Sequence, residues 1–403
     1  MPSATVRLGS SVVNIRRDLE ADNSARIERY AKQPELGPTL LFFSGGSAFN
    51  SAAGYLKRFT HNSIHLVTPF DSGGSSAKLR KAFDMPAVGD MRSRMIALAD
   101  ASLLGHPEVI TLFSHRLPVS TNNQQLRRDV EAFARGEGAL MSAVHEPMRT
   151  LIGENIRQFL QVAPADFEFS GASIGNLILT GGYLRQERAL DPIAFLLSQL
   201  VGVRGTVRTI TDENLHLKVM TASGREVVGQ HLITGKEAPA LGEPIVEISI
   251  VDADGKPARS QLTPSRSDLI AEAEMVIFPP GSFFSSLIAN LLPEGVSAAL
   301  HSSRAPKVFV PNLGVDPELA GISLRQQLET LEDYMQRGCS GAETPAKIDI
   351  LLTDSTLHPE VDADFAQWLH ARGTQLIDRD LRSWRDDGYY DELKLVEALL
   401  ALT

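Results

Sequence analysis

The chain of 403 residues is nearly free of cysteine, which excludes a fold held together by disulfides. Its single cysteine, Cys339, has no possible partner within the chain. Because disulfides belong to oxidising compartments, this composition favours a reducing one. Cys339 lies in a loop-like stretch without a neighbouring base, so we expect an ordinary, unactivated thiol.

Long hydrophobic runs and excess positive charge are missing as well. No apolar run reaches the roughly 18 residues of a membrane-spanning helix, and the first residues contain no signal-peptide core. Lys and Arg number 39 against 49 Asp and Glu, a net charge of −10, which argues against a general nucleic-acid-binding surface. We therefore expect a cytoplasmic protein that binds neither membranes nor nucleic acid, although a local basic pocket for a small anion remains compatible with this charge.

Several standard catalytic motifs are absent. The sequence contains neither G-x-G-x-x-G nor the P-loop pattern, so neither of these nucleotide-binding mechanisms applies in its standard form. The ten histidines do not form the helical H-E-x-x-H zinc pattern. No G-x-S-x-G elbow is present, and a Ser-His-Asp hydrolase is not supported.

The sequence has the pattern of an α/β protein. A polar extension, residues 1–36, precedes a body at 37–403 in which apolar strands, glycine-rich turns and helices alternate, as in a parallel sheet. A helical stretch at about 104–170 and a β-branched-rich stretch at about 205–251 interrupt this alternation. We predict a Rossmann-like parallel sheet with helices on both faces, a helical insertion and a small antiparallel β substructure.

Three glycine breaks each follow an apolar strand and precede a helix, at 41–50, 67–76 and 276–286. Because the carboxyl ends of parallel strands share one edge, we expect the three breaks to converge on one crevice. Glycines allow close backbone approach, and successive N–H groups with a helix N-terminus form a nest for phosphate. Hydroxyls that could donate to such an anion, or cap the helices, belong to Ser47, Ser75, Ser76 and Ser282.

Asp71 is unusual in the second break, because a carboxylate beside an anion nest is repulsive. It is explained if it binds a divalent cation, orients a ligand hydroxyl or accepts a proton, and alternatively if it only caps the turn. The bases Lys78, Arg80 and Arg92 follow closely in sequence. Since Arg92 and Arg94 diverge on a helix, we expect Arg92 to face the crevice.

Asn176 lies at a predicted helix start within an apolar run. A buried amide needs hydrogen-bond partners. It either caps the helix or reaches a ligand.

The ordered motifs "FSGGS", "DSGGSSAKLR", "PAVGDMRSRM", "SIGNLILTGGY" and "PPGSFFSSLIANLLPEG" resemble the 2-phospho-L-lactate transferase and gluconeogenesis-factor superfamily, over roughly residues 39–380. In motif detail the chain is more similar to the gluconeogenesis-factor branch. The resemblance implies a Rossmann-like core and a homodimer. It implies, in one branch, magnesium-dependent transfer of a phospholactyl group from a guanosine diphosphate donor and, in the other, binding of a UDP-sugar with a role in carbon metabolism and cell-wall regulation.

The positions that match the family's phosphate loops and adjoining segments are Gly45, Gly46, Ser47, Gly73, Gly74, Ser75, Ser76, Arg80, Gly89, Asp90, Arg92, Gly175, Asn176, Gly281 and Ser282. Asp71 matches the first of two paired acids and is the candidate catalytic and magnesium-binding residue. The chain departs from the family at Ser72, which replaces the second acid, and at Ala48, which replaces a glycine of the first loop. Losing one acid weakens the case for metal-assisted transfer, and Ala48 makes positive φ costly.

Three functions remain open. The first is a receptor for a phosphate-containing nucleotide, of the nucleoside-diphosphate or UDP-sugar type, in a metabolic or regulatory role. The second is a transferase that uses magnesium at Asp71, and no tightly bound organic cofactor is expected in either case. The third is a scaffold with a degenerate site that binds a protein partner through residues 1–36 or the helical insertion.

Overall fold

The computed structural model describes residues 3–8, 11–16, 23–102, 105–235, 239–339, 346–384 and 388–403. The predicted extension, residues 1–36, therefore lies partly outside the described residues. Within it, β1 (Ser3–Leu8) and β2 (Ser11–Arg16) pair antiparallel. Helix α1 (Asn23–Lys32) and the 3-10 turn η1 (Pro34–Leu36) follow.

A seven-stranded sheet forms the centre of the molecule, and all its strand pairs are parallel. In spatial order its strands are β12 (Gln375–Asp378), β11 (Ile350–Thr353), β10 (Lys307–Phe309), β9 (Met275–Phe278), β3 (Leu40–Ser44), β4 (Ile64–Val67) and β5 (Thr206–Thr209). The five inner strands are buried along their whole length, as expected for a parallel sheet covered on both faces.

Alternate strand residues belong to two separate hydrophobic clusters. Phe42 and Ile277 pack into one cluster, whereas Phe43 and Phe278 pack into the other, because successive side chains point to opposite faces of a sheet. The first cluster receives α2 (Asn50–Leu56), α3 (Gly74–Phe83), α4 (Gly89–Leu98) and α16 (Glu392–Ala401). The second receives α12 (Pro264–Glu272), α13 (Val296–Ser302), α14 (Leu324–Gln336) and α15 (Ala363–Arg372). The predicted α/β fold with helices on both faces is confirmed.

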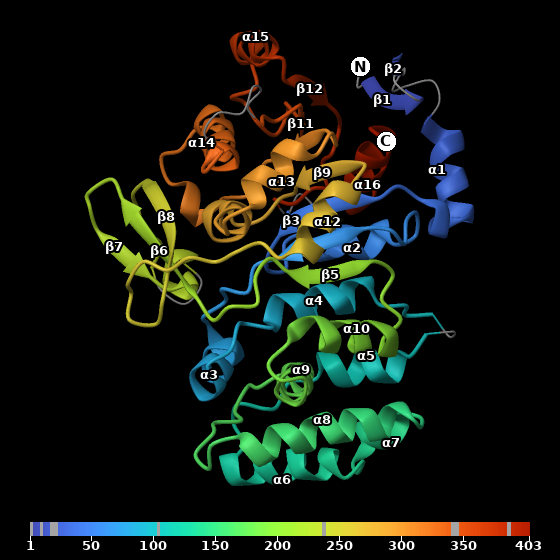
Figure 1. Ribbon diagram of the computed structural model, residues 1–403, viewed down its shortest axis with the longest axis vertical. Coiled ribbons are helices and arrows are strands. Elements are labelled where there is room, and N and C mark those ends of the chain that lie inside the picture. The colour runs from blue at the N-terminus through green and yellow to red at the C-terminus, as the bar shows by residue number, and fades with distance from the viewer. Residues whose placement is uncertain are drawn as a thin grey trace.

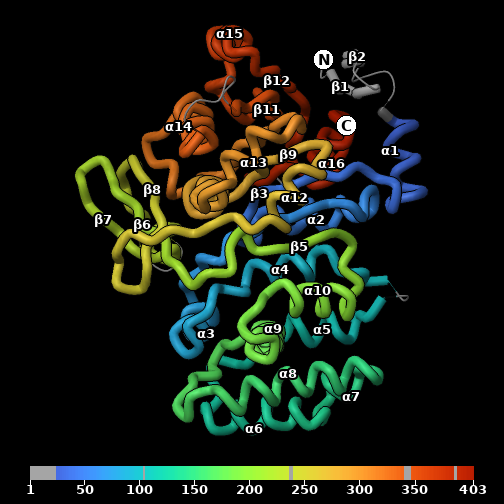
Figure 2. Tube along the Cα trace, in the orientation of Figure 1, coloured from blue at the N-terminus to red at the C-terminus, as the bar shows by residue number. Residues whose placement is uncertain are grey.

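The connection from β4 to β5 contains eight helices and forms the lower part of the molecule (Figures 1 and 2). After α3 and α4 come α5 (Pro107–Ser114), α6 (Asn123–Ala134), α7 (Ala139–Ala143), α8 (Met148–Val162), α9 (Ile174–Arg185) and α10 (Leu190–Leu200). Helices α5 to α8 correspond to the predicted insertion, of which residue 104 lies outside the described part. Helix α9 is buried almost all round because it is packed between these helices and the body.

The small antiparallel sheet consists of β7 (Glu226–Val228), β6 (His216–Thr221) and β8 (Ile245–Val251), with α11 (Gln230–Ile233) beside it. This sheet projects to one side of the body in Figure 1. The stretch expected to form it began at about 205, but β5 pairs instead with β4 at the edge of the parallel sheet. Its alternating burial is that of an edge strand, which resembles the antiparallel pattern.

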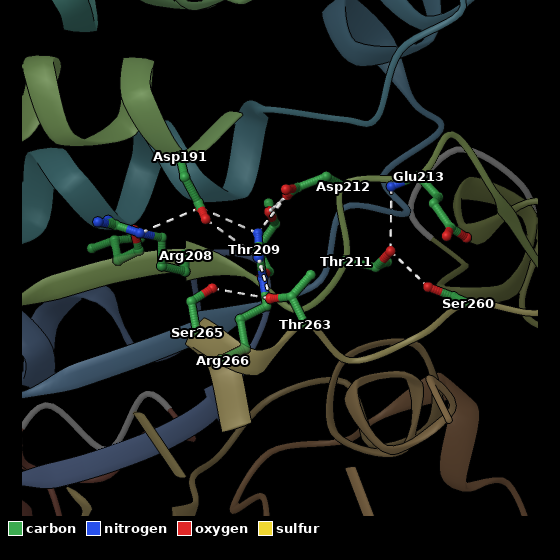
Figure 3. A network of polar contacts seen from close by, with 11 residues as sticks. Asp191, Arg208, Thr209, Thr211, Asp212, Glu213, Ser260, Thr263, Ser265 and Arg266 are labelled. Carbon is green, nitrogen blue, oxygen red and sulfur yellow. Dashed lines mark hydrogen bonds and ion pairs between the residues drawn. The ribbon is translucent and has the colours of Figure 1, made fainter. Parts of the chain in front are cut away.

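Arg266 ties the end of β5 to two helices (Figure 3). Its side chain is 1% exposed and lies 2.6 Å from a carboxylate oxygen of Asp212 and 3.2 Å from one of Asp191. Its Nε donates to the carbonyl of Thr209. Since Arg266 belongs to α12 and Asp191 to α10, the network fixes both helices at the C-terminal end of β5.

In the described part of the chain, no helix combines the length and the apolar character needed to cross a bilayer.

Candidate functional site

The strand order reverses at β3, whose two neighbours are β4 and β9. At such a switch point the loops that leave the carboxyl ends of the strands diverge, and a crevice forms between them. All three glycine breaks lie at this edge, after β3, β4 and β9. The predicted arrangement of the breaks along one edge is therefore confirmed, and two cavities are found there.

The first cavity has a volume of about 410 Å³, within the range of small-molecule sites. Its lining combines the first two breaks, the starts of α4 and α9, the segment after α5, and α11. The residues are Gly46, Ser47, Asp71, Gly73, Gly74, Ser75, Ser76, Gly89, Asp90, Arg92, Ser93, Arg116, Asn176, Gln230, His231 and Thr234. Ten of the predicted positions lie here together with Asp71, whereas Gly45, Arg80, Gly175, Gly281 and Ser282 do not line this cavity.

In the first break, Gly45 and Gly46 have different roles. A Cβ on Gly45 would lie 2.7 Å from the hydroxyl oxygens of Thr68 and Ser286, so Gly45 allows close packing of three loops. Gly46 has φ of +42° and open space around the position of a Cβ. Its N–H donates to Asp90 Oδ2 across 2.7 Å. The protein's own carboxylate therefore binds the amide that the sequence assigns to phosphate.

In the second break, Asp71 forms a turn. Its Oδ1 accepts a hydrogen bond from Gly73 N–H across 3.1 Å, which is the capping alternative weighed for this residue. Its other oxygen, Oδ2, would lie 3.3 Å from a Cβ at Gly89, so the carboxylate also approaches the start of α4. In the same break, Ser75 Oγ is shielded from solvent and has no hydrogen-bond partner among the described residues.

Two arginines, Arg92 and Arg116, line the cavity and interact electrostatically. Burial, and secondarily repulsion by Arg116, lower the pKa of Arg92 to about 10, while Asp90 opposes the shift. Arg92 Nη1 donates to the carbonyl of Phe113, but its Nε has no partner in the described part of the chain. A pair of guanidinium groups that repel each other is the arrangement that a bound anion stabilises.

Arg94 points away from the cavity, as expected from its divergence from Arg92. Its side chain is completely buried and donates to Asn50 Oδ1 and to His65 Nδ1. Gly175 permits the position of Arg92, since a Cβ there would lie 2.7 Å from Arg92 Cδ and 2.6 Å from the carbonyl oxygen of Phe113.

Asn176 does not cap helix α9. The N-cap is Ser173, and no side-chain cap hydrogen bond is formed. Asn176 is 2% exposed, lines the cavity, and its Oδ1 has no partner among the described residues. Of the two alternatives for this residue, the geometry favours contact with a ligand.

Arg80, expected at the basic end of the phosphate loop, connects the body to the antiparallel sheet instead. Its guanidinium donates to the carbonyls of Phe70, Asp71 and Leu215 and to Asn214 Oδ1. All these partners are protein groups, and Arg80 is 4% exposed. Its contribution to the site is therefore to hold the second break against the start of β6.

The third break differs from the other two because protein side chains occupy its amides. Gly281 N–H donates to Asn312 Oδ1, and the π-helical turn η2 (Phe283–Leu287) receives Asp316 and Glu318 at its N-terminus. Glu318 Oε2 accepts from the N–H groups of Phe284 and Ser285. Burial and the neighbouring Asp316 raise the pKa of Glu318 to about 7. A carboxyl group of the chain thus takes the place that an anion would occupy.

A second cavity of about 270 Å³ lies on the other side of the first break. Pro280 of the third break reaches it, and Phe49, Tyr389 and Tyr390 supply aromatic rings. Ser47 lines both cavities. The three breaks therefore surround two adjoining cavities and not one crevice.

Sequence reasoning missed the residues that complete the first cavity from distant segments. Arg116 comes from the helical insertion, Gln230 and His231 come from α11, and Thr234 is the C-cap of α11. No local spacing marks any of them. Ser72, which is visible in the sequence as a departure from the family, contacts His231 through its hydroxyl at 2.8 Å from Nδ1.

The site offers few ligands for magnesium. Mg²⁺ is held by carboxylates, water and phosphate oxygens in octahedral geometry. Asp71 uses Oδ1 for Gly73, and Asp90 uses Oδ2 for Gly46. No group of three or more His, Cys, Asp or Glu side chains arranged for a metal ion occurs among the described residues. These residues do not fit a metal site built by the protein alone, and a cation brought by a ligand would meet Asp71 Oδ2, the oxygen that does not bind Gly73 N–H.

Comparison with known proteins identifies the family. Two curated relatives are a putative gluconeogenesis factor of Nostoc sp., 28% identical over 73% of this chain and 52% of its own length, and a gluconeogenesis factor of Halalkalibacterium halodurans, 26% identical over 81% of both chains. The matched region thus spans about half the length of the Nostoc relative. A crystal structure of a UPF0052-family protein from Bacillus halodurans has the same fold, with a TM-score of 0.63, 23% identity and coverage of 90% of this chain and 98% of that one. The family model described as 2-phospho-L-lactate transferase CofD matches residues 40–389, and the chain therefore belongs to this family.

Proposed function

We propose that the protein binds a phosphate-containing nucleotide, of the nucleoside-diphosphate or UDP-sugar type, in the first cavity and serves a metabolic or regulatory role. The observation that carries this proposal is the pair Arg92 and Arg116, which repel each other beside two glycine breaks at the carboxyl edge of the sheet. A diphosphate between them would replace the repulsion with charge-assisted hydrogen bonds.

Unpartnered polar groups support the same conclusion. Ser75 Oγ, Arg92 Nε and Asn176 Oδ1 are buried without hydrogen-bond partners in the described part of the chain, and all three residues line the cavity. A buried polar group without a partner costs about 1–3 kcal/mol. Small rotations of these side chains toward a ligand would remove this cost, because the ligand's oxygens and N–H groups supply the missing partners.

The adjoining second cavity suggests where the remainder of the ligand lies. With Phe49, Tyr389 and Tyr390 in its lining, it offers aromatic surface to a planar base. Ser47 lies between the two cavities. The names of the curated relatives, gluconeogenesis factors, agree with a role in carbon metabolism.

A transferase is the second candidate, and the existence of two cavities that meet at Ser47 is the observation in its favour. A donor in one and an acceptor in the other would place a group for transfer beside the first break. Asp71 would then be the catalytic carboxylate or hold magnesium brought by the donor's phosphates. The family description agrees with this chemistry.

Thermal unfolding in the presence of UDP-N-acetylglucosamine, UDP, GDP, NAD or inorganic phosphate tests the proposal. A ligand at 100 times its dissociation constant stabilises the folded state by about 2.7 kcal/mol. We expect a nucleotide diphosphate to raise the midpoint of the wild type and not that of Arg92→Gln. If neither the UDP compounds nor GDP shifts the wild type, the proposal is wrong. A shift that requires both magnesium and Asp71, lost in Asp71→Ala, would favour the transferase.

A further inference from the structure

We infer that His231, positioned by Ser72, donates a hydrogen bond to the ligand's phosphates, and that this contact allows the site to bind a diphosphate without a divalent cation. This inference rests on the proposed function. It concerns Ser72, which replaces the family's second acid, and it assigns a role to His231 of α11, beside the antiparallel sheet.

The contact between Ser72 and His231 orients the imidazole and pairs its Nδ1. The backbone N–H of His231 donates to Ser72 Oγ across 3.2 Å. The same oxygen lies 2.8 Å from Nδ1 of the His231 ring. Nδ1 is the acceptor that the described residues offer to the Ser72 hydroxyl proton, and we assign the proton of this contact to the hydroxyl. A neutral imidazole whose Nδ1 accepts carries its proton on Nε2. Nε2 is then a donor, whichever charge state the ring adopts.

The local backbone holds the ring in this place. Gly229 has φ of +107°, and a Cβ there would lie 3.0 Å from His231 Cε1 and 3.2 Å from Nδ1. Only glycine leaves room for the ring at this conformation. His231 lines the first cavity while Ser72 does not, so Ser72 holds the ring from behind. Apart from the Ser72 contact, no hydrogen bond of the imidazole to another described residue is found.

The remaining donors and acceptors favour cationic side chains over a metal ion. Asp71 and Asp90 each use one oxygen for a backbone amide. Ser72 uses its hydroxyl for His231, and a neutral hydroxyl is a poorer magnesium ligand than the carboxylate it replaces. Imidazole suits softer metals than Mg²⁺. Arg92 and Arg116 together with His231 present N–H donors to a diphosphate, whose charge they can offset.

Isothermal titration of UDP and of inorganic diphosphate tests this inference, once in EDTA and once in excess magnesium. We expect the wild-type dissociation constant to agree within about twofold between the two conditions. His231→Leu removes the donor and should weaken binding by about tenfold or more, the effect of a hydrogen bond to a charged group. His231→Gln, which keeps an N–H donor near the position of Nε2, should lose less.

Variants of Ser72 test whether this residue affects binding by positioning His231. Ser72→Ala should weaken binding, and Ser72→Thr, which keeps the hydroxyl, should restore most of it. If Ser72 acts only through His231, the double variant Ser72→Ala with His231→Leu binds no more weakly than His231→Leu alone. Additive losses in this cycle would overturn the positioning role.

The outcomes distinguish this inference from the proposed function. If the wild type binds the UDP probe and magnesium tightens binding more than about tenfold, the metal-free site is wrong while the nucleotide site stands. Unchanged affinity in His231→Leu, with an unchanged unfolding midpoint, likewise overturns the role of His231. If the wild type binds neither UDP nor diphosphate under either condition, the proposed function and the inference fail together.

Discussion

The guanidinium of Arg94 donates a hydrogen bond to Nδ1 of His65 across 2.8 Å, and neither side chain has any exposed surface. Because arginine has no acceptor, Nδ1 must be unprotonated, and the other ring nitrogen, Nε2, is placed to donate to Ser63 Oγ at 3.1 Å. Burial, and secondarily the charge of Arg94, hold the pKa of His65 well below its usual value. A neutral histidine and a buried arginine thus contact Phe49 and Asn50 at the end of the first glycine break.

His65→Gln should remove a pH dependence of stability. In the unfolded state His65 protonates below about pH 6.5, whereas in the folded state it stays neutral. The free energy of unfolding therefore falls as the pH falls below this value, by up to about 1.4 kcal/mol per pH unit. Glutamine can accept from Arg94 without titrating. Urea unfolding of the wild type, His65→Gln and the exposed control His145→Gln between about pH 5 and pH 8 measures the difference. Equal pH slopes in all three proteins would contradict the prediction.

Glu318→Gln should change stability in the opposite pH direction. Burial and Asp316 raise the folded-state pKa of Glu318 to about 7, above the unfolded value of about 4.3. The protonated carboxyl therefore favours the fold at low pH, and this contribution is lost as the pH rises from about 4.3 to about 7. Glutamine keeps one oxygen for the amides of Phe284 and Ser285. The stability of the variant relative to the wild type should rise over this pH interval and then stay constant, as followed by urea unfolding.

Arg266→Met should destabilise the protein. Removal of the guanidinium leaves the Thr209 carbonyl, Asp191 and Asp212 without their donor. Because the two carboxylates are 38% and 32% exposed, water can replace part of this contact, and we expect a loss of about 1–3 kcal/mol. Arg208 provides a matched control, since it contacts the same Asp191 at 3.4 Å but its side chain is 21% exposed. For Arg208→Met we expect a loss of about 0–1 kcal/mol. Chemical unfolding of both variants checks the contrast, and similar losses would show that the network of Figure 3 is not centred on Arg266.

Local sequence patterns were sufficient to predict the strands of the parallel sheet other than β5. Short apolar runs such as β3 and β9, each followed directly by a glycine or proline turn, are typical of strands covered on both faces. The edge strand β5 alternates in burial and was placed with the antiparallel sheet. Its pairing with β4 depends on 138 residues of intervening helices, between Val67 and Thr206, and no local pattern records that pairing.

The position of the first two glycine breaks at the edge of the sheet was predictable for the same reason: strand, glycine turn and helix are local patterns. The occupation of the third break was not, because Glu318 is 34 residues from Phe284 in sequence and its contact forms only after folding. Arg116 and His231 likewise reach the cavity from the insertion and from α11. The sequence showed that Ser72 stands where the family has its second acid. Only the structure shows that its hydroxyl contacts His231.

Gly175→Ala should impair both packing and binding. The new methyl group would lie 2.6 Å from the carbonyl oxygen of Phe113 and 2.7 Å from Arg92 Cδ, and such overpacking costs about 1–3 kcal/mol. Displacement of Arg92 should also weaken UDP binding. Gly281→Ala is the control, since a Cβ there meets nothing within 4 Å and its φ is not in the left-handed region. Unfolding and titration of both variants test the assignment, and loss of binding in Gly281→Ala would instead place the ligand against the third break.

Arg116→Gln should stabilise the free protein and weaken ligand binding. The charge of Arg116 opposes that of Arg92 when no anion is bound, and Arg116 is exposed, so removing the repulsion should raise the free energy of unfolding by only about 0.2–1 kcal/mol. With a diphosphate in the cavity the same charge becomes favourable, and its loss should raise the dissociation constant of UDP. A residue that lowers stability in the free protein but increases affinity is typical of a functional site.

The control is Arg128→Gln, which replaces an exposed arginine of α6 outside the cavity and should change neither stability nor affinity by a comparable amount. If Arg116→Gln lowers stability and leaves affinity unchanged, Arg116 is a structural residue and the cavity has a single ligand-binding arginine, Arg92.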